Sequence, residues 1–513
     1  MTAYDTIVIG AGHNGLVCAA YLAKAGQRVL LLEAAESAGG LAADREFHPG
    51  FHAPVAHSIN HFSSKVASDL DLARHGYTLP AATMPLIGLA EHRSVSVHEG
   101  RTSGLDDADA KAYERYHGLL RRFAGALAPA WQKTMPGLGN NSLRELMTFA
   151  QIGLDLRRLG KKDMGEFLRI ASLPMRDLVD EYFEDELLKA LLCWDGIIGS
   201  KMAPRSPNSA VLSLLYRMSE DSHGAHTIPN GGVAALGNAL KEAAEVAGTE
   251  IRFSAEVARV RIDSNTDGLS ASGVHLADGE TIEADRVVCA TDAKRAFLGL
   301  VGVEYLDIGF TNRIRRLRSD GLVGKLHLAL KGAPEFRSTE YLTGRMIIAP
   351  TMDSIEFAFD DAKYGQCPEE PVMEVVVPSA TDSSLAPDDQ HVLSAHVMYV
   401  PYHLKGGWDD AAREWIANRA IETLAKYAPG IRGQVIYSEF LTPRDLEQQY
   451  RVSGGHWQHG DFSMDQILMM RPTYEAAQYD SPISGLHLCS AACHPGGDIT
   501  GLAGHNAAKA LLR

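Results

Sequence analysis

The stretch that decides the fold runs from Thr6 to Glu33, TIVIGAGHNGLVCAAYLAKAGQRVLLLE. Its first four residues are β-branched or aliphatic and predict a short strand. Residues 16–25 predict a helix that Gly26 ends, and residues 28–32 predict a second strand. The stretch is therefore a complete strand–helix–strand unit of about thirty residues, which is the unit that binds dinucleotides when its first turn is rich in glycine.

The first turn of this unit has the sequence GAGHNG. Gly10 permits the tight turn, Gly12 lets the backbone approach a pyrophosphate, and Gly15 lets the helix pack closely on the strand. The N-terminus of the helix, which includes Asn14, offers free N–H groups and a positive dipole end to the phosphates. Glu33 follows the third glycine by eighteen residues, where a carboxylate accepts hydrogen bonds from a ribose. These features together predict a dinucleotide site.

The residues after Glu33 favour FAD over NAD as the dinucleotide. The segment EAAESAGG resembles the acid-then-Gly-Gly segment of flavoproteins of the amine oxidase and phytoene desaturase superfamily. In those proteins the backbone that matches Gly39 and Gly40 passes beside the diphosphate and the ribityl chain of the flavin. The next residue is usually Arg in the family, and here it is Leu41. One charged phosphate contact is therefore missing, and other donors must replace it.

The chain returns to the nucleotide-binding domain in its middle. Residues 251–260 predict an extended segment, and residues 284–292 predict a buried strand that ends on small residues. In similar flavoproteins the residue that matches Val257 pairs its backbone with the adenine. We therefore expect Val257 to contact the adenosine end of the cofactor.

The C-terminus supplies a third piece. Residues 485–490 predict a short strand, residues 491–501 a glycine-rich turn, and residues 502–512 a helix. The N-terminus of such a helix is a natural donor to the N1–C2=O edge of a flavin, where negative charge develops on reduction. The alternative is a plain C-terminal hairpin and helix. The turn offers three expected cofactor contacts, Gly497, Asp498 and Ile499.

Further blocks in the last third of the chain resemble the same family. They are PSATDSSLAP at 378–387, PYHL at 401–404 with GW at 407–408, and HGDFSMDQILMMRP at 459–472. With the glycine motifs, these blocks make the chain similar to the phytoene desaturase-like branch of FAD oxidoreductases in the amine oxidase superfamily. Within that branch it most resembles the group typified by pyridine nucleotide-disulphide oxidoreductase domain-containing protein 2.

The resemblance implies an α/β fold with two domains. A Rossmann-type FAD-binding domain is assembled from three separate segments, 1–60, 225–310 and 475–513. An α+β substrate-binding domain takes residues 61–224 and 311–474.

The substrate-binding domain includes a helical part at about 105–220, which matches no family motif. The sequence SLRE at 142–145 is a capping box, and apolar residues follow it at helical spacing. A helical insertion at this point is where the superfamily builds the roof over its substrate. The basic run at 157–162 can contact anionic lipid, although such a run is more often a solvated helix end that complements the dipole.

Composition narrows the possible partners. The chain has 49 basic and 64 acidic residues, a formal charge of −15, so it has little electrostatic reason to bind nucleic acid. No apolar stretch approaches the length that spans a bilayer, so a membrane contact would be peripheral. The first residues lack the basic and apolar regions of a signal peptide, and we therefore expect a cytoplasmic protein.

The six cysteines include no Cys-x-x-Cys pair. Flavoprotein disulfide reductases carry a redox-active pair soon after the first nucleotide unit, and the segment after Gly40 contains no cysteine. Dithiol chemistry is therefore excluded, and the cysteines are expected to be buried small hydrophobes. No metal-ligand spacing stands out, so we expect no metal.

Histidines are the candidate acid–base groups, because an imidazole titrates near neutrality. His459 heads one of the family blocks, His494 lies in the glycine-rich turn, and His57 follows the Gly-Gly segment. For each of them the alternative is a hydrogen-bonded packing role.

The resemblance implies an enzyme that dehydrogenates, or desaturates, a C–C or C–N bond of an organic and largely apolar substrate. Hydride would pass to flavin N5, and the electrons would leave to oxygen or a quinone. Two alternatives remain. A flavin amine oxidase would need an aromatic pair facing the flavin, and a flavin-bound interaction protein without turnover would have a narrow or blocked cavity.

Overall fold

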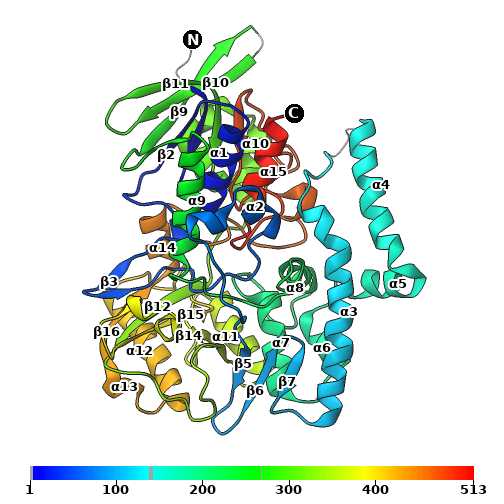
Figure 1. Ribbon diagram of the computed structural model, residues 1–513, viewed down its shortest axis with the longest axis vertical. Helices are drawn as coiled ribbons and strands as arrows, with labels where there is room; N and C mark the ends of the chain where they lie inside the picture. Colours follow the sequence, from blue (N-terminus) through cyan, green and yellow to red (C-terminus); the bar gives the residue numbers. More distant parts are fainter. Residues whose placement is uncertain (1–3, 138–141, 267) are drawn as a thin grey trace.

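The computed structural model describes residues 4–137, 142–266 and 268–513 of the chain. Two large sheets dominate it, one above the other in the view of Figure 1. Both sheets are built from segments that lie far apart in the sequence. No helix in the described ranges is long and apolar enough to cross a membrane.

The first sheet has seven strands in the order β8-β2-β1-β11-β10-β9, with β17 paired to β11. The strands β8, β2, β1, β11 and β17 run parallel, and β9 to β11 form an antiparallel extension. In chain order the strands are β1 Tyr4–Ile9, β2 Val29–Leu32, β8 Glu250–Arg252, β9 Val257–Asn265, β10 Gly268–Leu276, β11 Thr281–Cys289 and β17 Leu486–Leu488. Three stretches of chain, near the start, the middle and the end, therefore form one sheet.

Three helices pack beside this sheet: α1 His13–Lys24, α9 Ala234–Val246 and α15 Leu502–Leu511. Figure 1 shows them together, from three distant parts of the sequence. Glycines allow the close approach. A Cβ on Gly15 would lie 2.0 Å from the carbonyl oxygen of Gly10, and a Cβ on Gly504 would lie 2.1 Å from that of Asn14. The helices can therefore sit against the turn only because these two positions carry no side chain.

The second sheet has eight strands in the order β16-β12-β15-β14-β13-β5-β6-β7. In chain order they are β5 Leu86–Leu89, β6 Ser94–His98, β7 Arg101–Ser103, β12 Val323–Leu330, β13 Arg345–Ile348, β14 Met373–Val376, β15 His391–Met398 and β16 Val435–Leu441. The helix α12, Asp410–Tyr427, packs on it through a separate apolar core. The two sheets draw on the segments that the sequence assigned to different domains, while the exact domain bounds stay a prediction.

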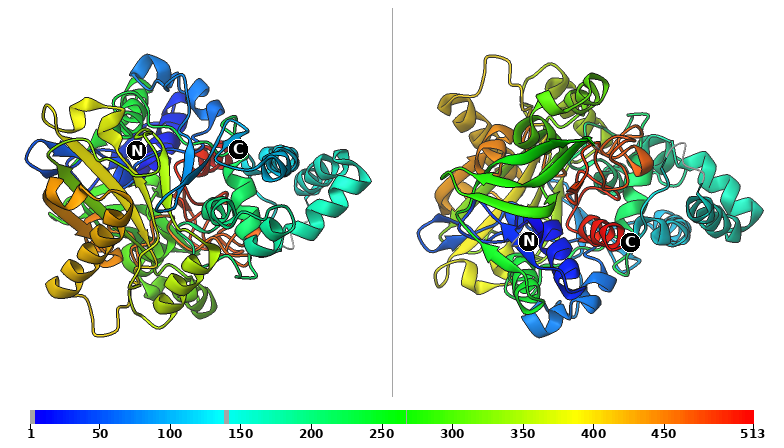
Figure 2. Two further views of the ribbon diagram at one scale, coloured as in Figure 1. Left: turned by 90° about the horizontal axis from the view of Figure 1, so that it is seen from below. Right: turned by 90° about the horizontal axis from the view of Figure 1, so that it is seen from above.

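Helices form the third part of the molecule. They are α3 Asp107–Trp131, α4 Leu143–Arg158, α5 Gly160–Ile170, α6 Met175–Asp180, α7 Glu186–Ile197 and α8 Ala210–Arg217. The side chain of Ser142 accepts a hydrogen bond from the Glu145 amide at the start of α4, as the capping sequence predicts. In Figures 1 and 2, α4 and α5 stand outside α3 as the outermost elements of the molecule.

Candidate functional site

A cavity of about 470 Å³ lies between the two sheets and contains most of the residues that the sequence analysis selected. Those that line it are Gly10, Gly12, Asn14, Gly15, Glu33, Gly39, Gly40, Leu41, Val257, Asp498, Ile499 and His459. Gly497 does not line it, and an added Cβ there would contact the Gln458 side chain. The three distant parts of the first sheet thus meet around one space, and the role of each residue toward a cofactor stays a prediction.

The outer end of the cavity is formed by the first turn of the nucleotide unit. A Cβ on Gly12 would meet nothing within 4 Å, so this glycine borders open space at the N-terminus of α1. Glu33 accepts hydrogen bonds from the amides of Ala11 (2.6 Å) and Ala35 (2.8 Å), which hold its carboxylate at the cavity wall. An anion-binding helix end and a fixed carboxylate are the two features that pyrophosphate and ribose require.

The inner end of the cavity is lined by charged side chains that the sequence analysis did not select. Arg345 is buried and donates to Asp195 (2.7 Å) and to Glu374 (2.7 Å), the first from α7 and the second from β14. Burial alone would raise the pKa of Glu374, but the Arg345 guanidinium lowers it well below its usual value. These three residues form a fully paired ionic network at the bottom of the cavity.

A second ion pair lies beside this network. Arg217 on α8 donates to Asp498 at 2.7 Å and to the carbonyl oxygen of Ile198 at 3.2 Å. Burial would raise the pKa of Asp498, and Arg217 lowers it far below the usual range of a carboxyl group. Asp498 therefore stays ionised and fixed in place at the glycine-rich turn, where the sequence analysis expected a cofactor contact.

Glu374 also binds a buried chain of basic groups. It accepts from His57 Nε2 (3.0 Å) and from Trp194 Nε1 (2.7 Å), and His57 Nδ1 lies 2.8 Å from Lys325 Nζ. Burial lowers the pKa of the Lys325 amine well below its usual value. Lys325 Nζ can donate a hydrogen bond to His57 Nδ1, because His57 uses Nε2 to donate to Glu374.

His57, Glu374 and His396 are close enough together to hold a cation. The Glu374 carboxylate is already occupied by three donors: the Arg345 guanidinium, His57 and Trp194. A metal ion would have to displace these contacts and face the positive charge of Arg345, so we assign no metal to the cluster.

The three candidate histidines lie in different surroundings. His459 lines the main cavity, whereas His57 lines a smaller neighbouring cavity of about 240 Å³. His494 lines neither of these two cavities; its Nε2 donates to the carbonyl oxygen of Ala130, and its ring stacks on Trp131. His494 lies in the glycine-rich turn but outside these two cavities, and its contacts are those of a packed side chain, so a catalytic role for it stays a prediction.

His396 on β15 is a cavity residue that the sequence analysis missed. Its Nε2 donates to the carbonyl oxygen of Val55 at 3.2 Å, which leaves the lone pair on Nδ1 with no partner among the described residues. Burial lowers the pKa of His396 well below its usual value, so the ring is a neutral acceptor. The ring packs between His57 and Trp457.

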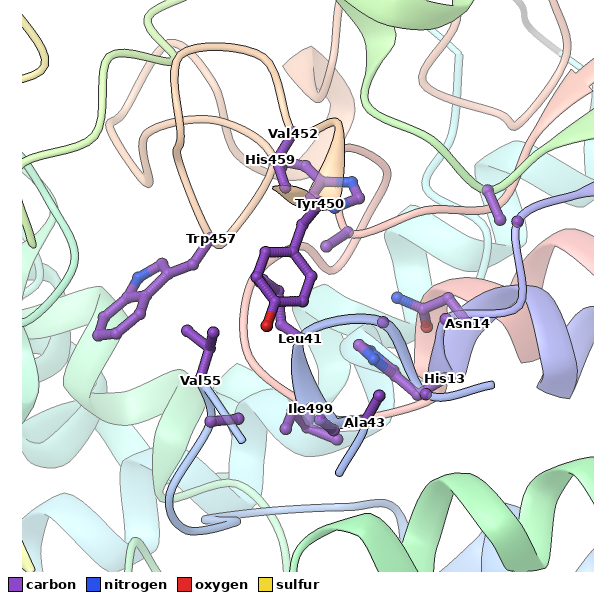
Figure 3. A pocket seen from close by; sticks show the side chains of 18 of the residues that line it. His13, Asn14, Leu41, Ala43, Val55, Tyr450, Val452, Trp457, His459 and Ile499 are labelled. Carbon is purple, nitrogen blue, oxygen red and sulfur yellow. The ribbon is translucent and has the colours of Figure 1, made fainter. Parts of the chain in front are cut away.

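Figure 3 shows Tyr450, Trp457 and His13 arranged around the space of the main cavity. Several lining residues have a buried polar atom without a partner in the described structure. These atoms are His13 Nε2, Arg45 Nε, His396 Nδ1, Gln458 Oε1 and His459 Nδ1. Buried polar atoms nearly always find a partner, so a bound molecule with polar groups fits this cavity. The open space at Gly12 and the orphaned atoms both agree with a dinucleotide cofactor.

The strands that carry Glu374, Arg345 and Lys325 contain a sequence signal that could have selected these residues. Glu374 lies in MEVV, Arg345 in RMII and Lys325 in VGKLHLAL, and every residue of these three strands is buried. A charged residue in an otherwise apolar strand must find a buried partner of opposite charge. That pattern marks a candidate residue, but it does not say which charges meet.

Buried histidines give the protein a pH-dependent stability. Burial lowers the pKa of His456 to about 3 and that of His494 to about 4, while an unfolded histidine titrates near 6.5. Between these values the unfolded chain binds more protons, so the free energy of unfolding falls as the pH falls, by about 1.4 kcal/mol per pH unit for each histidine.

We therefore expect denaturant unfolding to show constant stability above about pH 7 and a steep loss from about pH 6.5 downward. The variant His456→Gln should show a shallower slope, by about 1.4 kcal/mol per pH unit. A slope that the substitution leaves unchanged would contradict the assignment of His456 as a buried neutral group.

Comparisons with known proteins agree with the geometry. Residues 15–512 match the model of the family described as flavin containing amine oxidoreductase. The mouse (Mus musculus) pyridine nucleotide-disulfide oxidoreductase domain-containing protein 2 is 32% identical over 99% of this chain and 93% of its own length. The chloroplastic prolycopene isomerase of Arabidopsis thaliana is 25% identical over 98% of this chain and 81% of its own length.

The fold is also found among solved structures. An oxidoreductase from Methanosarcina mazei superposes with a TM-score of 0.60 at 17% identity, with 99% of both chains covered. The α/β fold expected from the sequence is therefore confirmed, and so is the family resemblance. The chain belongs to the flavin containing amine oxidoreductase family and is a flavin-dependent oxidoreductase with FAD as its cofactor.

Proposed function

We propose that the protein dehydrogenates a C–C or C–N bond of a neutral, largely apolar organic substrate, and that its electrons pass to oxygen or a quinone. One observation carries the proposal: a single cavity joins the nucleotide turn at Gly12 to a buried end whose charges are already paired. FAD, when bound, supplies the two-electron acceptor.

The nucleotide end of the cavity holds the cofactor. The amides at the N-terminus of α1 bind its pyrophosphate beside Gly12, and Glu33 binds its adenosine ribose. Val257 would contact its adenosine end, and the turn at Asp498 and Ile499 would contact its flavin end; all three residues line the cavity. These assignments follow the family motifs and the positions of the residues around the cavity.

The paired charges select the substrate. Arg345 is saturated by Asp195 and Glu374, so it offers no free cation to a substrate carboxylate. Arg217 is likewise saturated by Asp498 and two carbonyl oxygens. A charged substrate would have to break one of these pairs in a buried site, which is costly. A neutral substrate can instead pack on apolar lining residues such as Val55, Ile198 and Trp457.

We propose His396, which lines the cavity, as the group that accepts a proton from the substrate. Its Nδ1 is a neutral acceptor, and its ring is fixed by the Val55 carbonyl oxygen and by Trp457. When a C–C or C–N bond becomes a double bond, one carbon loses a hydride and the neighbouring atom loses a proton, so a proton acceptor is required. His459 is the second cavity histidine with an unpartnered Nδ1 and is the alternative acceptor.

A second candidate function is the oxidation of amines. Tyr450 and Trp457 are two aromatic side chains that line the same cavity, as Figure 3 shows. An amine oxidase needs an aromatic pair facing the flavin. If the two rings flank the reacting carbon, a neutral amine becomes the favoured substrate.

The direction of electron flow gives the test. We expect excess NADPH, under anaerobic conditions, to leave the flavin band at about 450 nm unchanged for minutes. The sequence has one glycine-motif nucleotide unit, and FAD occupies it, so we expect no nicotinamide site. Neutral hydrocarbons that can be dehydrogenated and amines should then be added in separate anaerobic experiments. We expect only one of these two classes of compound to bleach the flavin. Bleaching by NADPH within seconds would reverse the direction and make the protein a reductase.

A further inference from the structure

The helix α4, Leu143–Arg158, has an exposed apolar face. Leu143 is 76% exposed, Met147 64% and Leu146 51%. Ala150 and Leu154, one and two turns further along, are exposed as well. Spacings of three, four, seven and eleven residues place these five side chains on one side of the helix. We refer to Leu143, Leu146, Met147, Ala150 and Leu154 as the apolar stripe.

The apolar stripe lies on the outside of a helix whose other face is only partly buried against the body of the protein. Glu145 on that inner face accepts from the Gln478 side chain at 3.0 Å. The following helix, α5, is held to α3 by the Arg122–Asp163 ion pair at 2.9 Å and by the edge-to-face contact of Phe123 with Phe167. The two helices are therefore anchored on the body of the protein. Turning the stripe inward would break these contacts.

Basic residues follow the apolar stripe directly. They are Arg157 and Arg158 at the end of α4 and Lys161 and Lys162 at the start of α5, and all four are exposed. Arg158 pairs with the half-buried Asp155, and the other three form no ion pair with a described residue. Among the described side chains of α4, none of the exposed ones is acidic. This local positive charge stands out on a chain of net charge −15.

We propose that α4 and the start of α5 dock the protein on a membrane surface that contains anionic lipids. The apolar stripe enters the boundary between headgroups and acyl chains, and Lys161, Lys162 and Arg157 contact the lipid phosphates. α4 and α5 are the outermost elements in Figures 1 and 2, so a flat bilayer can reach them without meeting the body first. The inference is independent of the proposed reaction.

A second copy of the chain fits this surface less well. Pairing two stripes would bring the basic runs of two copies together, and the exposed, described positions of α4 offer no carboxylate to pair with them. An anionic bilayer supplies both the apolar layer and the negative charge.

Flotation of the FAD-loaded protein with vesicles tests the proposal. Wild-type protein should float with phosphatidylcholine vesicles that contain about one third phosphatidylglycerol, more weakly with pure phosphatidylcholine, and less at high salt. The double variant Leu143→Glu with Met147→Glu should bind at least about tenfold more weakly. Lys161→Glu with Lys162→Glu should lose the preference for anionic lipid, again with a loss of about tenfold or more.

The matched control is Phe357→Glu with Tyr364→Glu on or beside α11, Met352–Lys363, where the side chains are 70% and 77% exposed. This variant should float like wild type, and all variants should keep their flavin content. The proposal would be overturned if the wild-type protein floats with neither kind of vesicle. If sedimentation then shows a dimer that Leu143→Glu with Met147→Glu dissociates, the stripe is an interface between copies. Equal loss in the control would also overturn it.

Discussion

The variant Gly12→Arg is expected to purify without colour. A side chain at this position enters the open space at the N-terminus of α1, where the pyrophosphate must approach the backbone amides. We expect the Kd for FAD to rise at least about a hundredfold, equivalent to about 2.7 kcal/mol. The flavin absorbance of the purified protein at about 450 nm, relative to the protein absorbance at about 280 nm, measures the bound flavin.

The structure makes this experiment specific to the cofactor. The backbone φ of Gly12 is −68°, which any residue adopts, and an added Cβ meets no atom within 4 Å, so the fold itself tolerates the change. The control is Gly125→Arg, the same substitution at an exposed glycine of α3 that also has open space around it. Gly125→Arg should keep a full flavin spectrum. A full spectrum in Gly12→Arg would show that the cofactor does not lie at this turn.

The variant Glu374→Gln is expected to lose about 3 kcal/mol of stability. The Glu374 side chain is 2% exposed, and it shares Arg345 with Asp195. Without its charge, the buried guanidinium keeps only one anionic partner, and His57 and Trp194 lose a charged acceptor. Thermal unfolding at saturating FAD should therefore begin several degrees lower than in the wild type.

An exposed pair is the control for this effect. Glu370 pairs with Lys426 at 2.8 Å but is 73% exposed, so Glu370→Gln should cost less than about 1 kcal/mol. Equal losses in the two variants would mean that the buried network contributes no more to the stability than an exposed ion pair does.

The wild type should in addition be destabilised in acid. The lowered pKa of Glu374 stabilises the fold fully above the unfolded value near 4.3, and this contribution is lost progressively as the pH falls from there toward the lower folded pKa.

The nucleotide unit was predictable from the sequence because its parts are local. Gly10, Gly12 and Gly15 are fixed by the geometry of one turn, and Glu33 is placed by the length of one helix and one strand. The structure has that helix at His13–Lys24 and the second strand at Val29–Leu32, close to the predicted bounds. Backbone conformation within about thirty residues depends mainly on residue type and period, and both are visible in the sequence.

The return of the chain to the first sheet, near Val257 and near Asp498, was predictable from the family resemblance and not from local physical chemistry. The motif residues match a family whose chain order is fixed, so their meeting at one cavity could be expected. His57 and His494 show the limit of this reasoning. Both are close in sequence to cofactor segments, but neither lines the main cavity, because packing decides the direction of a side chain.

What the sequence by itself determined is a strand–helix–strand unit with its glycine turn and its acid, at the end of the cavity where FAD is expected. Only the tertiary structure decided the inner end, where Asp195, Arg345 and Glu374 meet from α7, β13 and β14. Arg345 and Glu374 are each the single charge of an apolar strand, and Asp195 follows the apolar run 190–194 of α7; nothing local says which partner each one meets. Their pairing depends on how α7 packs against β13 and β14 of the second sheet. Only once these elements are packed does the cost of burying an unpaired charge hold the three side chains together.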